Sequence, residues 1–413
     1  MKVTFCAYDF PNRVGGPSSW LPRLLPGLKK RGIESKVLFL TTGEIEKCQS
    51  IQLVKQLGFE HKVQVWHTYT EQRVRWILEQ LKEDPPDVFI PNLMVPAFYA
   101  SRWLKKAGIP TIGVMHSDDD FHYGLLDQFV FGSPQYQLSG FVCVSHFLEQ
   151  TVKKMGSTST VIRCIPYGAP LPPSTTQKPP DNLRIAYVGS LKEEQKRISE
   201  VAKAFCRVVK EIPKTEAVFY GNGSASSTVE KIIAEQGENL PIELAGRIDS
   251  DKIQEYLLQC HVIVLLSDYE GLPIALMEAM ACGVVPVCLR IRSGIPELIE
   301  DGVTGLLVDD RGDKFVEAIR RLREDLTLWE KLSQGTRGKI EAEYSSEVGA
   351  DLWAKFIQEL HENSQSHGKI KIPPFLSLPP IHSGLVREDQ RYPSLVNRLR
   401  KKTSQIFNQI KTS

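Results

Sequence analysis

Glu270-Gly-Leu-Pro-Ile-Ala-Leu-Met-Glu278-Ala-Met-Ala-Cys-Gly283 is the stretch that says most about the fold and chemistry of this chain. It follows a buried-strand pattern over 262–266, which places Glu270 in a strand-to-helix loop and Pro273 at the first helical position. Unpaired N–H groups at such a helix start, at the positive end of the helix dipole, form a site for a phosphate or a sugar oxygen. Glu278 follows about one and a half turns later, close enough for both carboxylates to flank one ligand. A charged ligand that carries hydroxyls fits this arrangement.

The spacing of the two glutamates does not establish a site by itself. The chain has 49 acidic residues, so two of them eight positions apart will occur by chance. A glutamate on an amphipathic helix usually faces solvent. The surrounding sequence therefore has to show whether the two glutamates belong to a ligand site or to a solvated helix face.

Short apolar runs alternate with helical segments along both halves of the chain, which is the pattern of parallel sheets with crossover helices. The runs of the first half are 3–8, 36–40, 63–66, 88–90, 111–115, 141–144 and 161–165. A Pro-, Ser- and Thr-rich stretch over 169–180 interrupts the pattern and marks a domain boundary. The runs of the second half are 184–188, 217–220, 242–245, 262–266, 284–289 and 306–308. The sequence thus predicts an α/β protein with two doubly wound, Rossmann-like domains and a ligand cleft at the carboxyl ends of their strands.

Composition and charge limit the class of protein. A chain of 413 residues exceeds one hydrophobic core, and its 42% hydrophobic and 24% charged residues are those of a soluble globular protein. A net charge of +2 argues against a general nucleic-acid binder, whose basic surface would shift the whole balance. No apolar stretch has the length of a signal peptide or membrane span, so we expect a cytoplasmic protein. The eight cysteines lack a Cys-x-x-Cys spacing and predict reduced core thiols.

Three segments of the second half closely resemble one known family. They are Ser-Asp-Tyr-Glu-Gly-Leu-Pro at 267–273, Glu-Ala-Met-Ala-Cys-Gly-Val-Val-Pro-Val at 278–287, and Gly-Ile-Pro-Glu-Leu-Ile-Glu-Asp-Gly-Val-Thr-Gly-Leu-Leu-Val at 294–308. They look like the retaining nucleotide-sugar glycosyltransferases of family 4 (glycosyl transferases group 1), which share the two-domain GT-B fold. The resemblance implies an acceptor-side domain over 1–172, a donor domain over 181–345 and a helix over 346–362 that crosses back onto the first domain.

The resemblance assigns roles to residues on the donor side. Glu270 is expected at the sugar, and Glu278 at the ribose hydroxyls, because a carboxylate accepts two hydrogen bonds from adjacent hydroxyls. Gly271, Leu272 and Pro273 are expected to place the helix start at the donor.

The diphosphate side departs from the family pattern. Lys196 is expected to hold the diphosphate, whose growing negative charge a nearby cation stabilises. Ser190 stands where the family usually has an arginine, so Arg197 or Arg247 would have to substitute. A solvated charged turn over 192–197 is the alternative to a diphosphate site.

Three further loops follow strands. His116 stands where the family has a histidine beside the donor sugar, although a lone histidine at a strand end is more often structural. Gly15 and Gly16 permit close approach of the backbone to the donor phosphate or acceptor, although a tight turn needs them equally. Gly221 begins a Gly-x-Gly that we place in the nucleotide pocket, a weak motif taken alone. Ser145 is a further pocket candidate.

Asp118, Asp119 and Asp120 look like the Asp-x-Asp motif with which a different glycosyltransferase fold binds manganese. The cluster lies in the first half of the chain, whereas the donor features lie in the second. Acceptor contacts or plain solvation are therefore favoured over metal binding. We expect no metal, and no cofactor besides the nucleotide-sugar that serves as donor substrate.

Residues 366–413 lie outside the resemblance. Prolines at 373, 374, 379 and 380 predict a poorly folding linker. Over 394–411, apolar residues share one helical face and basic residues flank them, as in helices that lie on the inner face of an anionic membrane. A helix packed against the protein or a partly disordered tail is the alternative. Peripheral membrane contact would favour a lipid-linked acceptor.

The leading functional hypothesis is retaining transfer of a hexosyl unit from a nucleoside diphosphate sugar to the hydroxyl of a glycan, a lipid-linked glycan or a small alcohol. No side chain is assigned as nucleophile, so catalysis would depend on positioning and on stabilisation of the diphosphate. A nucleotide-sugar epimerase or a polymerase on the same fold is one alternative. A non-catalytic nucleotide-sugar-binding or assembly subunit, with Ser190 as the mark of a degenerate site, is the other.

Overall fold

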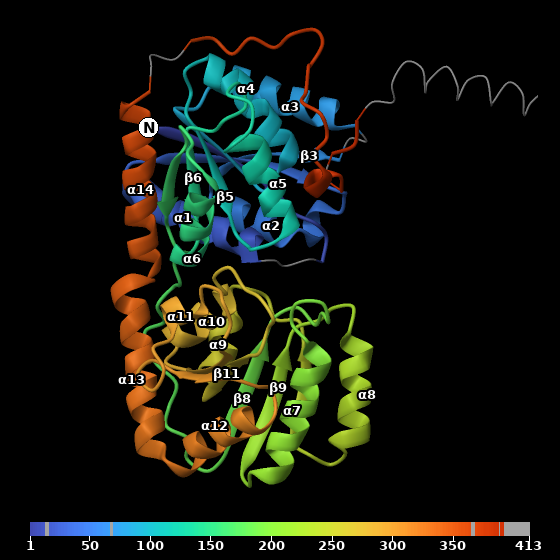
Figure 1. Ribbon diagram of the computed structural model, residues 1–413, viewed down its shortest axis with the longest axis vertical. Coiled ribbons are helices and arrows are strands. Elements are labelled where there is room, and N and C mark those ends of the chain that lie inside the picture. Colours follow the sequence, from blue (N-terminus) through green and yellow to red (C-terminus); the bar gives the residue numbers. More distant parts are fainter. Residues whose placement is uncertain (13–15, 67–68, 365–367, 388, 392–413) are drawn as a thin grey trace, which may run out of the picture.

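The structure is a computed structural model that describes residues 1–12, 16–66, 69–364, 368–387 and 389–391. Two parallel sheets form the cores of two domains stacked along the long axis (Figure 1). The N-terminal sheet has the order β3-β2-β1-β4-β5-β6-β7 and the C-terminal sheet the order β10-β9-β8-β11-β12-β13. Both contain the 3-2-1-4-5-6 order of a doubly wound fold, so the predicted α/β class is confirmed.

The strands match the predicted apolar runs to within three residues at each end. Those of the N-terminal domain are β1 (Lys2–Tyr8), β2 (Glu34–Thr41), β3 (Glu60–Val65), β4 (Val88–Asn92), β5 (Thr111–Met115), β6 (Gly140–Cys143) and β7 (Val161–Cys164). Those of the C-terminal domain are β8 (Leu183–Val188), β9 (Thr215–Tyr220), β10 (Ile242–Gly246), β11 (Val262–Leu265), β12 (Val285–Leu289) and β13 (Leu306–Val308). Central strands such as β4 and β12 are buried at every residue, because helices cover both faces of a parallel sheet.

Amphipathic helices connect the strands. The N-terminal domain contains α1 (Gly16–Lys30), α2 (Gln49–Gln56), α3 (Thr70–Glu83), α4 (Val95–Lys106), α5 (Asp120–Phe129) and α6 (His146–Met155). The C-terminal domain contains α7 (Ile198–Glu211), α8 (Ser226–Gln236), α9 (Ile253–Leu257), α10 (Ile274–Ala281), α11 (Ile295–Leu298), α12 (Asp313–Glu324) and α13 (Leu326–Glu343). Short 3-10 turns are η1 (Ile45–Lys47) and η2 (Ser383–Leu385). None of the helices in the described ranges is both long and apolar enough to cross a membrane.

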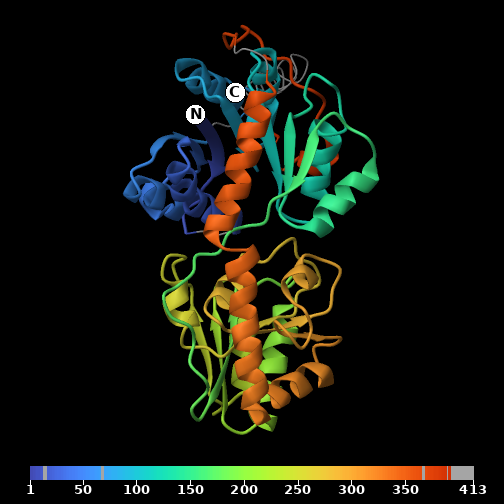
Figure 2. The same ribbon diagram turned by 90° about the vertical axis from the view of Figure 1, so that its left-hand side faces the viewer.

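The chain returns to the N-terminal domain through α14 (Ser346–Glu362), which continues the line of α13 along one side of both domains (Figure 2). The contact with α1 is tight, because a Cβ added to Gly27 would lie 2.5 Å from Ala350. Arg31 of α1 also donates to Asp351 at 2.7 Å. The two segments that cross between the domains bond each other, since the backbone N–H of Ala169 donates to the carbonyl of Tyr344 at 2.8 Å.

Residues 368–387 and 389–391, here named the C-terminal strap, run back over the N-terminal domain (Figure 1). The prediction of a poorly folding linker is therefore wrong for this segment. Its prolines cannot donate to a sheet, but arginines of the domain bond the strap carbonyls: Arg75 donates to Pro374 at 2.6 Å and Arg102 to Ser377 at 2.9 Å. Tyr99 donates to the buried Asp389 at 2.7 Å. The predicted helix over 394–411 lies outside the described residues.

Leu385 makes the strap part of the folded domain. Its side chain is fully buried against Gly124 of α5, whereas Phe375 in the same strap is 90% exposed. We expect Leu385→Ala to lower the free energy of unfolding by about 2–5 kcal/mol, and the control Phe375→Ala to change it by at most about 0.5 kcal/mol. Urea unfolding of the full chain measures both. Equal effects of the two substitutions would contradict a folded strap.

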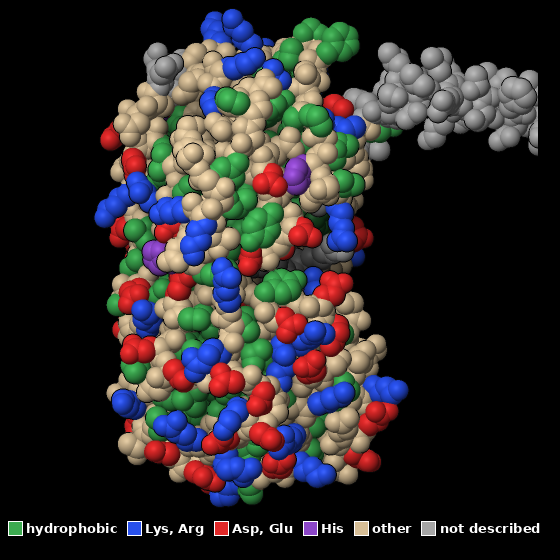
Figure 3. Space-filling model, in the orientation of Figure 1, with side chains coloured by type: hydrophobic (Ala, Val, Ile, Leu, Met, Phe, Trp, Pro, Cys, Tyr) green, Lys and Arg blue, Asp and Glu red, His purple; other side chains and the backbone are tan. Residues whose placement is uncertain are grey.

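Surface charge is mixed in sign. On the face shown in Figure 3, Lys and Arg side chains alternate with Asp and Glu over the C-terminal domain. This mixing accords with the net charge of +2.

Candidate active site

A cavity of about 480 Å³ lies between the domains, at the carboxyl ends of strands from both sheets. That volume is within the usual range for small-molecule sites. Eleven of the residues singled out in the sequence line it: His116, Asp119, Ser190, Lys196, Gly221, Arg247, Glu270, Gly271, Leu272, Pro273 and Glu278. Gly16 begins α1, and Gly15 lies outside the described residues.

The start of α10 differs by one residue from the prediction. Pro273 is the N-cap, with an extended conformation at φ −76° and ψ 110°, and the helix begins at Ile274. The helix axis still begins at the cavity wall, and Glu278 follows within α10. The predicted juxtaposition of a helix start and two carboxylates is therefore present in the structure.

Lys196 and Glu270 form an ion pair within the cavity wall. Glu270 is 6% exposed, and Gln195 holds its loop by donating to the carbonyl of Tyr269 at 2.9 Å. The cation expected at the diphosphate thus neutralises the carboxylate expected at the sugar. A pair of this kind keeps two buried charges satisfied.

Arg197 does not take the place of the missing arginine. It is absent from the cavity lining, and its Nε atom lies 2.6 Å from Asp268, which also pairs with Arg311. The left-handed backbone of Arg197, with φ 49°, marks the turn between the Lys196 loop and α7. Arg247 does line the cavity.

Arg23 of α1 was not singled out from the sequence. Its Nη2 atom lies 2.5 Å from Oε1 of Glu278 and donates to the carbonyl of Ser250 at 2.9 Å. Burial raises the pKa of Glu278, and the charge of Arg23 acts against that rise. An ion pair between residues 255 positions apart in different domains has no local sequence signal.

The domains touch at Gly271. A Cβ at this position would lie 2.1 Å from the backbone oxygen of His116, and a Cβ at Gly294 would lie 2.2 Å from the oxygen of Gly271. Glycine at position 271 is thus required by the close approach of the two domains. Gly221 is also a packing residue, because its Cβ would lie 1.8 Å from the oxygen of Gly189.

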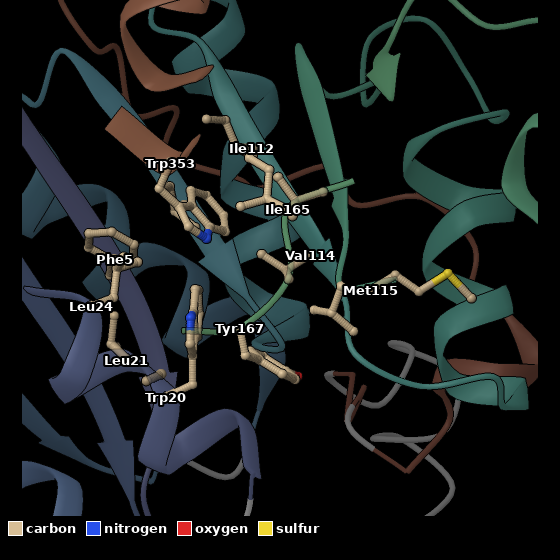
Figure 4. Packing of buried hydrophobic residues seen from close by; sticks show 14 of the residues in the cluster. Phe5, Trp20, Leu21, Leu24, Ile112, Val114, Met115, Ile165, Tyr167 and Trp353 are labelled. Carbon is tan, nitrogen blue, oxygen red and sulfur yellow. The ribbon is translucent and has the colours of Figure 1, made fainter. Parts of the chain in front are cut away.

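His116 has both ring nitrogens bonded within the protein. Nε2 lies 2.7 Å from the amide oxygen of Asn92, and Nδ1 bonds the hydroxyl of Tyr167. The amide oxygen can only accept, which assigns the proton to Nε2 and leaves Nδ1 to accept from Tyr167. Burial lowers the pKa of His116 well below its usual value, so the ring is neutral. Trp20 packs between Tyr167 and Trp353 of α14, with ring centroids 5.9 and 5.4 Å away (Figure 4).

The N-terminus of α6, which Ser145 caps, contacts the C-terminal domain outside the cavity. The hydroxyl of Ser145 caps α6 by accepting from the N–H of Leu148 at 3.3 Å, and Ser145 is absent from the cavity lining. Glu297, from the C-terminal domain, accepts from the N–H groups of His146 and Phe147 at 2.9 and 2.7 Å. A carboxylate from one domain therefore binds a helix N-terminus of the other.

The three aspartates that resemble a metal motif occupy different structural positions. Asp118 accepts from the hydroxyl of Tyr123 at 2.5 Å, whereas Asp119 is the N-cap of α5 and Asp120 its first residue. Within the described ranges, no three His, Cys, Asp or Glu side chains are grouped to hold a metal ion.

Two facing Rossmann-like domains with a cavity at the carboxyl ends of their strands define the GT-B fold of glycosyltransferases. The description "Glycosyltransferase Family 4" matches residues 14–171, and "Glycosyl transferases group 1" matches residues 173–339. The chain belongs to this family, as the sequence motifs predicted.

Relatives and solved structures agree with this assignment. The amylovoran biosynthesis glycosyltransferase AmsK of Erwinia amylovora is 32% identical over 186 residues, 43% of this chain and 45% of that relative. A GDP-mannose-dependent phosphatidylinositol monomannoside mannosyltransferase of Corynebacterium glutamicum is 23% identical over 387 residues, 86% of this chain and 98% of that relative. The structure of Anabaena HepE in complex with UDP and glucose superposes with a TM-score of 0.71 at 16% identity, covering 87% of this chain and 99% of that one. The chain spans less than half the length of the first curated relatives it matches.

Proposed function

We propose that this protein is a retaining glycosyltransferase that moves a hexosyl unit from a nucleoside diphosphate sugar to an acceptor hydroxyl, without an essential metal. The observation that carries the proposal is the meeting of Lys196, Glu270, Glu278 and the start of α10 in one cavity between the domains. Nucleotide-bound neighbours of the same fold, such as HepE with UDP-glucose, support it.

The cavity wall offers groups for each part of the donor. The start of α10 and Lys196 suit the diphosphate, and Glu278 suits the ribose hydroxyls. Arg23 and Arg247 add further positive charge to the described wall. Protein cations can therefore meet the charge of the diphosphate without a metal ion.

The main requirement of the reaction is stabilisation of the diphosphate leaving group, and no side chain has to act as a nucleophile. The bond between the anomeric carbon and the diphosphate oxygen breaks with its electron pair left on that oxygen, and the acceptor oxygen forms the new bond on the same face. Lys196 stabilises the growing negative charge once the diphosphate has drawn it from Glu270. Glu270 is then free to bond a sugar hydroxyl.

Donor binding tests the proposal directly. Among UDP, GDP, ADP and dTDP and their sugars, we expect one base to raise the unfolding midpoint by several degrees, because a ligand at about 100 times its Kd stabilises by about 2.7 kcal/mol. The shift is expected to be the same with EDTA present. A chain stabilised by none of these nucleotides would not be a nucleotide-sugar enzyme.

One observation favours a second candidate, a non-catalytic nucleotide-sugar-binding subunit. Ser190 replaces the usual arginine, and Arg197 pairs with Asp268 outside the cavity. Release of nucleoside diphosphate from a bound nucleotide-sugar separates the two functions. Stabilisation without any release would favour the binding subunit.

A further inference from the structure

His122 occupies the wall of the cavity that the N-terminal domain provides. It is the third residue of α5 and is 5% exposed. Its Nδ1 atom lies 2.7 Å from Oδ1 of Asp119, which also accepts from the backbone N–H of His122 at 3.0 Å. No pattern in the sequence singles out this histidine beside the three aspartates.

Asp119 fixes the tautomer of His122. Burial acts to raise the pKa of Asp119, but the hydrogen bonds that it accepts from the ring and the backbone of His122 help to lower it to about 2, so the carboxylate is ionised near neutral pH. An ionised carboxylate can only accept, which assigns a proton to Nδ1. In the neutral ring, Nε2 then has a free lone pair.

Nε2 of His122 has no hydrogen-bond partner in the described structure. A buried polar atom without a hydrogen-bond partner destabilises the folded state. The imidazole of His122 is not needed to cap α5. Asp119 caps the helix by accepting from the backbone N–H at position 122, which any side chain at that position would leave in place. A ligand hydroxyl that reaches the ring from the cavity would satisfy this atom.

The neighbouring polar groups of the same wall have other partners. His116, whose ring centroid is 6.2 Å away, bonds Asn92 and Tyr167 through its two nitrogens. Arg23 is only a donor and faces Glu278. Within the described lining of this wall, His122 therefore offers a buried acceptor atom that has no hydrogen-bond partner.

We propose that His122, oriented by Asp119, binds the attacking hydroxyl of the sugar acceptor and receives its proton. This inference rests on the proposed function. The acceptor oxygen forms its bond to the anomeric carbon while the bond to the diphosphate breaks with its electron pair on the leaving oxygen. The acceptor proton passes to Nε2, and Asp119 stabilises the resulting imidazolium. The proton then leaves to the diphosphate or to water. Asp119 is a positioning residue in this step.

The ring nitrogens can be observed directly. In long-range ¹⁵N–¹H spectra of the histidine-labelled full chain, we expect His122 in the Nδ1–H form and His116 in the Nε2–H form. Glycerol, methyl α-D-glucoside and n-octyl β-D-glucoside serve as hydroxyl probes in the presence of the stabilising nucleotide. A shift of the Nε2 signal of His122 with at least one of them supports the inference, and no shift with any of them overturns it.

Kinetics separates acceptor binding from donor binding. We expect His122→Gln to lower nucleoside diphosphate release in the presence of the effective probe by about 10²–10⁴-fold, the contribution of a proton-accepting residue. Thermal stabilisation by the nucleotide is expected to stay unchanged. Asp119→Asn keeps a good N-cap, so a decrease in rate with a changed His122 tautomer would reflect positioning and not loss of folding.

His146 offers a matched control. It pairs with Glu149 at 3.3 Å with the same three-residue spacing, but its side chain is 66% exposed and lies outside the cavity lining. His146→Gln is expected to leave release unchanged. An unchanged rate in His122→Gln, or a loss of nucleotide stabilisation in that variant, would overturn the inference. Absence of nucleotide stabilisation in the wild-type chain would instead contradict the proposed function.

Discussion

Replacement of Lys196 by methionine is expected to lower kcat for sugar transfer by about 10²–10³-fold, the usual effect of removing one group that stabilises an oxyanion. The ammonium is placed where the diphosphate is expected to gain charge, within the wall that Glu270 shares. Because this charge grows mainly in the transition state, kcat should fall more than the donor KM rises. Initial rates of nucleoside diphosphate release measure both constants.

Lys192 provides the control for this prediction. It is an exposed lysine in the same loop and is absent from the cavity lining. Lys192→Met should leave kcat unchanged. The double variant Lys196→Met/Glu270→Gln removes the buried charge that the single variant leaves unpaired, so it should recover stability without recovering turnover. Equal kcat values for Lys196→Met and wild type would remove Lys196 from the diphosphate site.

Glu278→Ala is expected to have two large effects, on donor affinity and on stability. The variant loses the carboxylate proposed to bind the ribose, so stabilisation by the nucleotide should disappear. It also leaves the guanidinium of Arg23 buried without its counter-charge, which costs about 3–5 kcal/mol of the free energy of unfolding. Calorimetric titration with nucleotide and urea unfolding measure the two effects separately.

A second substitution separates these effects. Arg23→Met in the Glu278→Ala background removes the unpaired charge, so stability should return while nucleotide affinity stays low. Unchanged affinity in Glu278→Ala would refute the ribose role. Full recovery of affinity in the double variant would mean that Glu278 only neutralises Arg23.

The sequence predicted those features that depend on local pattern. Apolar runs located both sheets, because strands covered on two faces consist of nearly continuous apolar residues. The motif from Glu270 to Gly283 located one wall of the cavity, because a strand, a turn and a helix start bring its residues to one place. The end of a helix is less well determined, and Pro273 serves as cap instead of first helical residue.

Features that depend on contact between distant segments were not predictable in this way. Arg23 pairs with Glu278 across the domain boundary. His122 becomes a candidate site residue only because the fold places it in the cavity wall. The sequence offered Arg197 as a replacement for the missing arginine, but in the structure Arg197 pairs with Asp268. The prolines of the C-terminal strap predicted a lack of regular structure. They did not predict that arginines of the N-terminal domain would bond carbonyl groups of the strap.

The path of α14 and the C-terminal strap has a consequence for biosynthesis. The N-terminal domain leaves the ribosome before the C-terminal domain, yet the helix and strap that cover it are translated only after the whole C-terminal domain. Apolar surface around Trp20, which later meets Trp353, therefore stays uncovered while the second domain is made. Domains generally fold as units during synthesis, N-terminal first. In this chain, the domain that is made first is therefore the last to receive all of its helices.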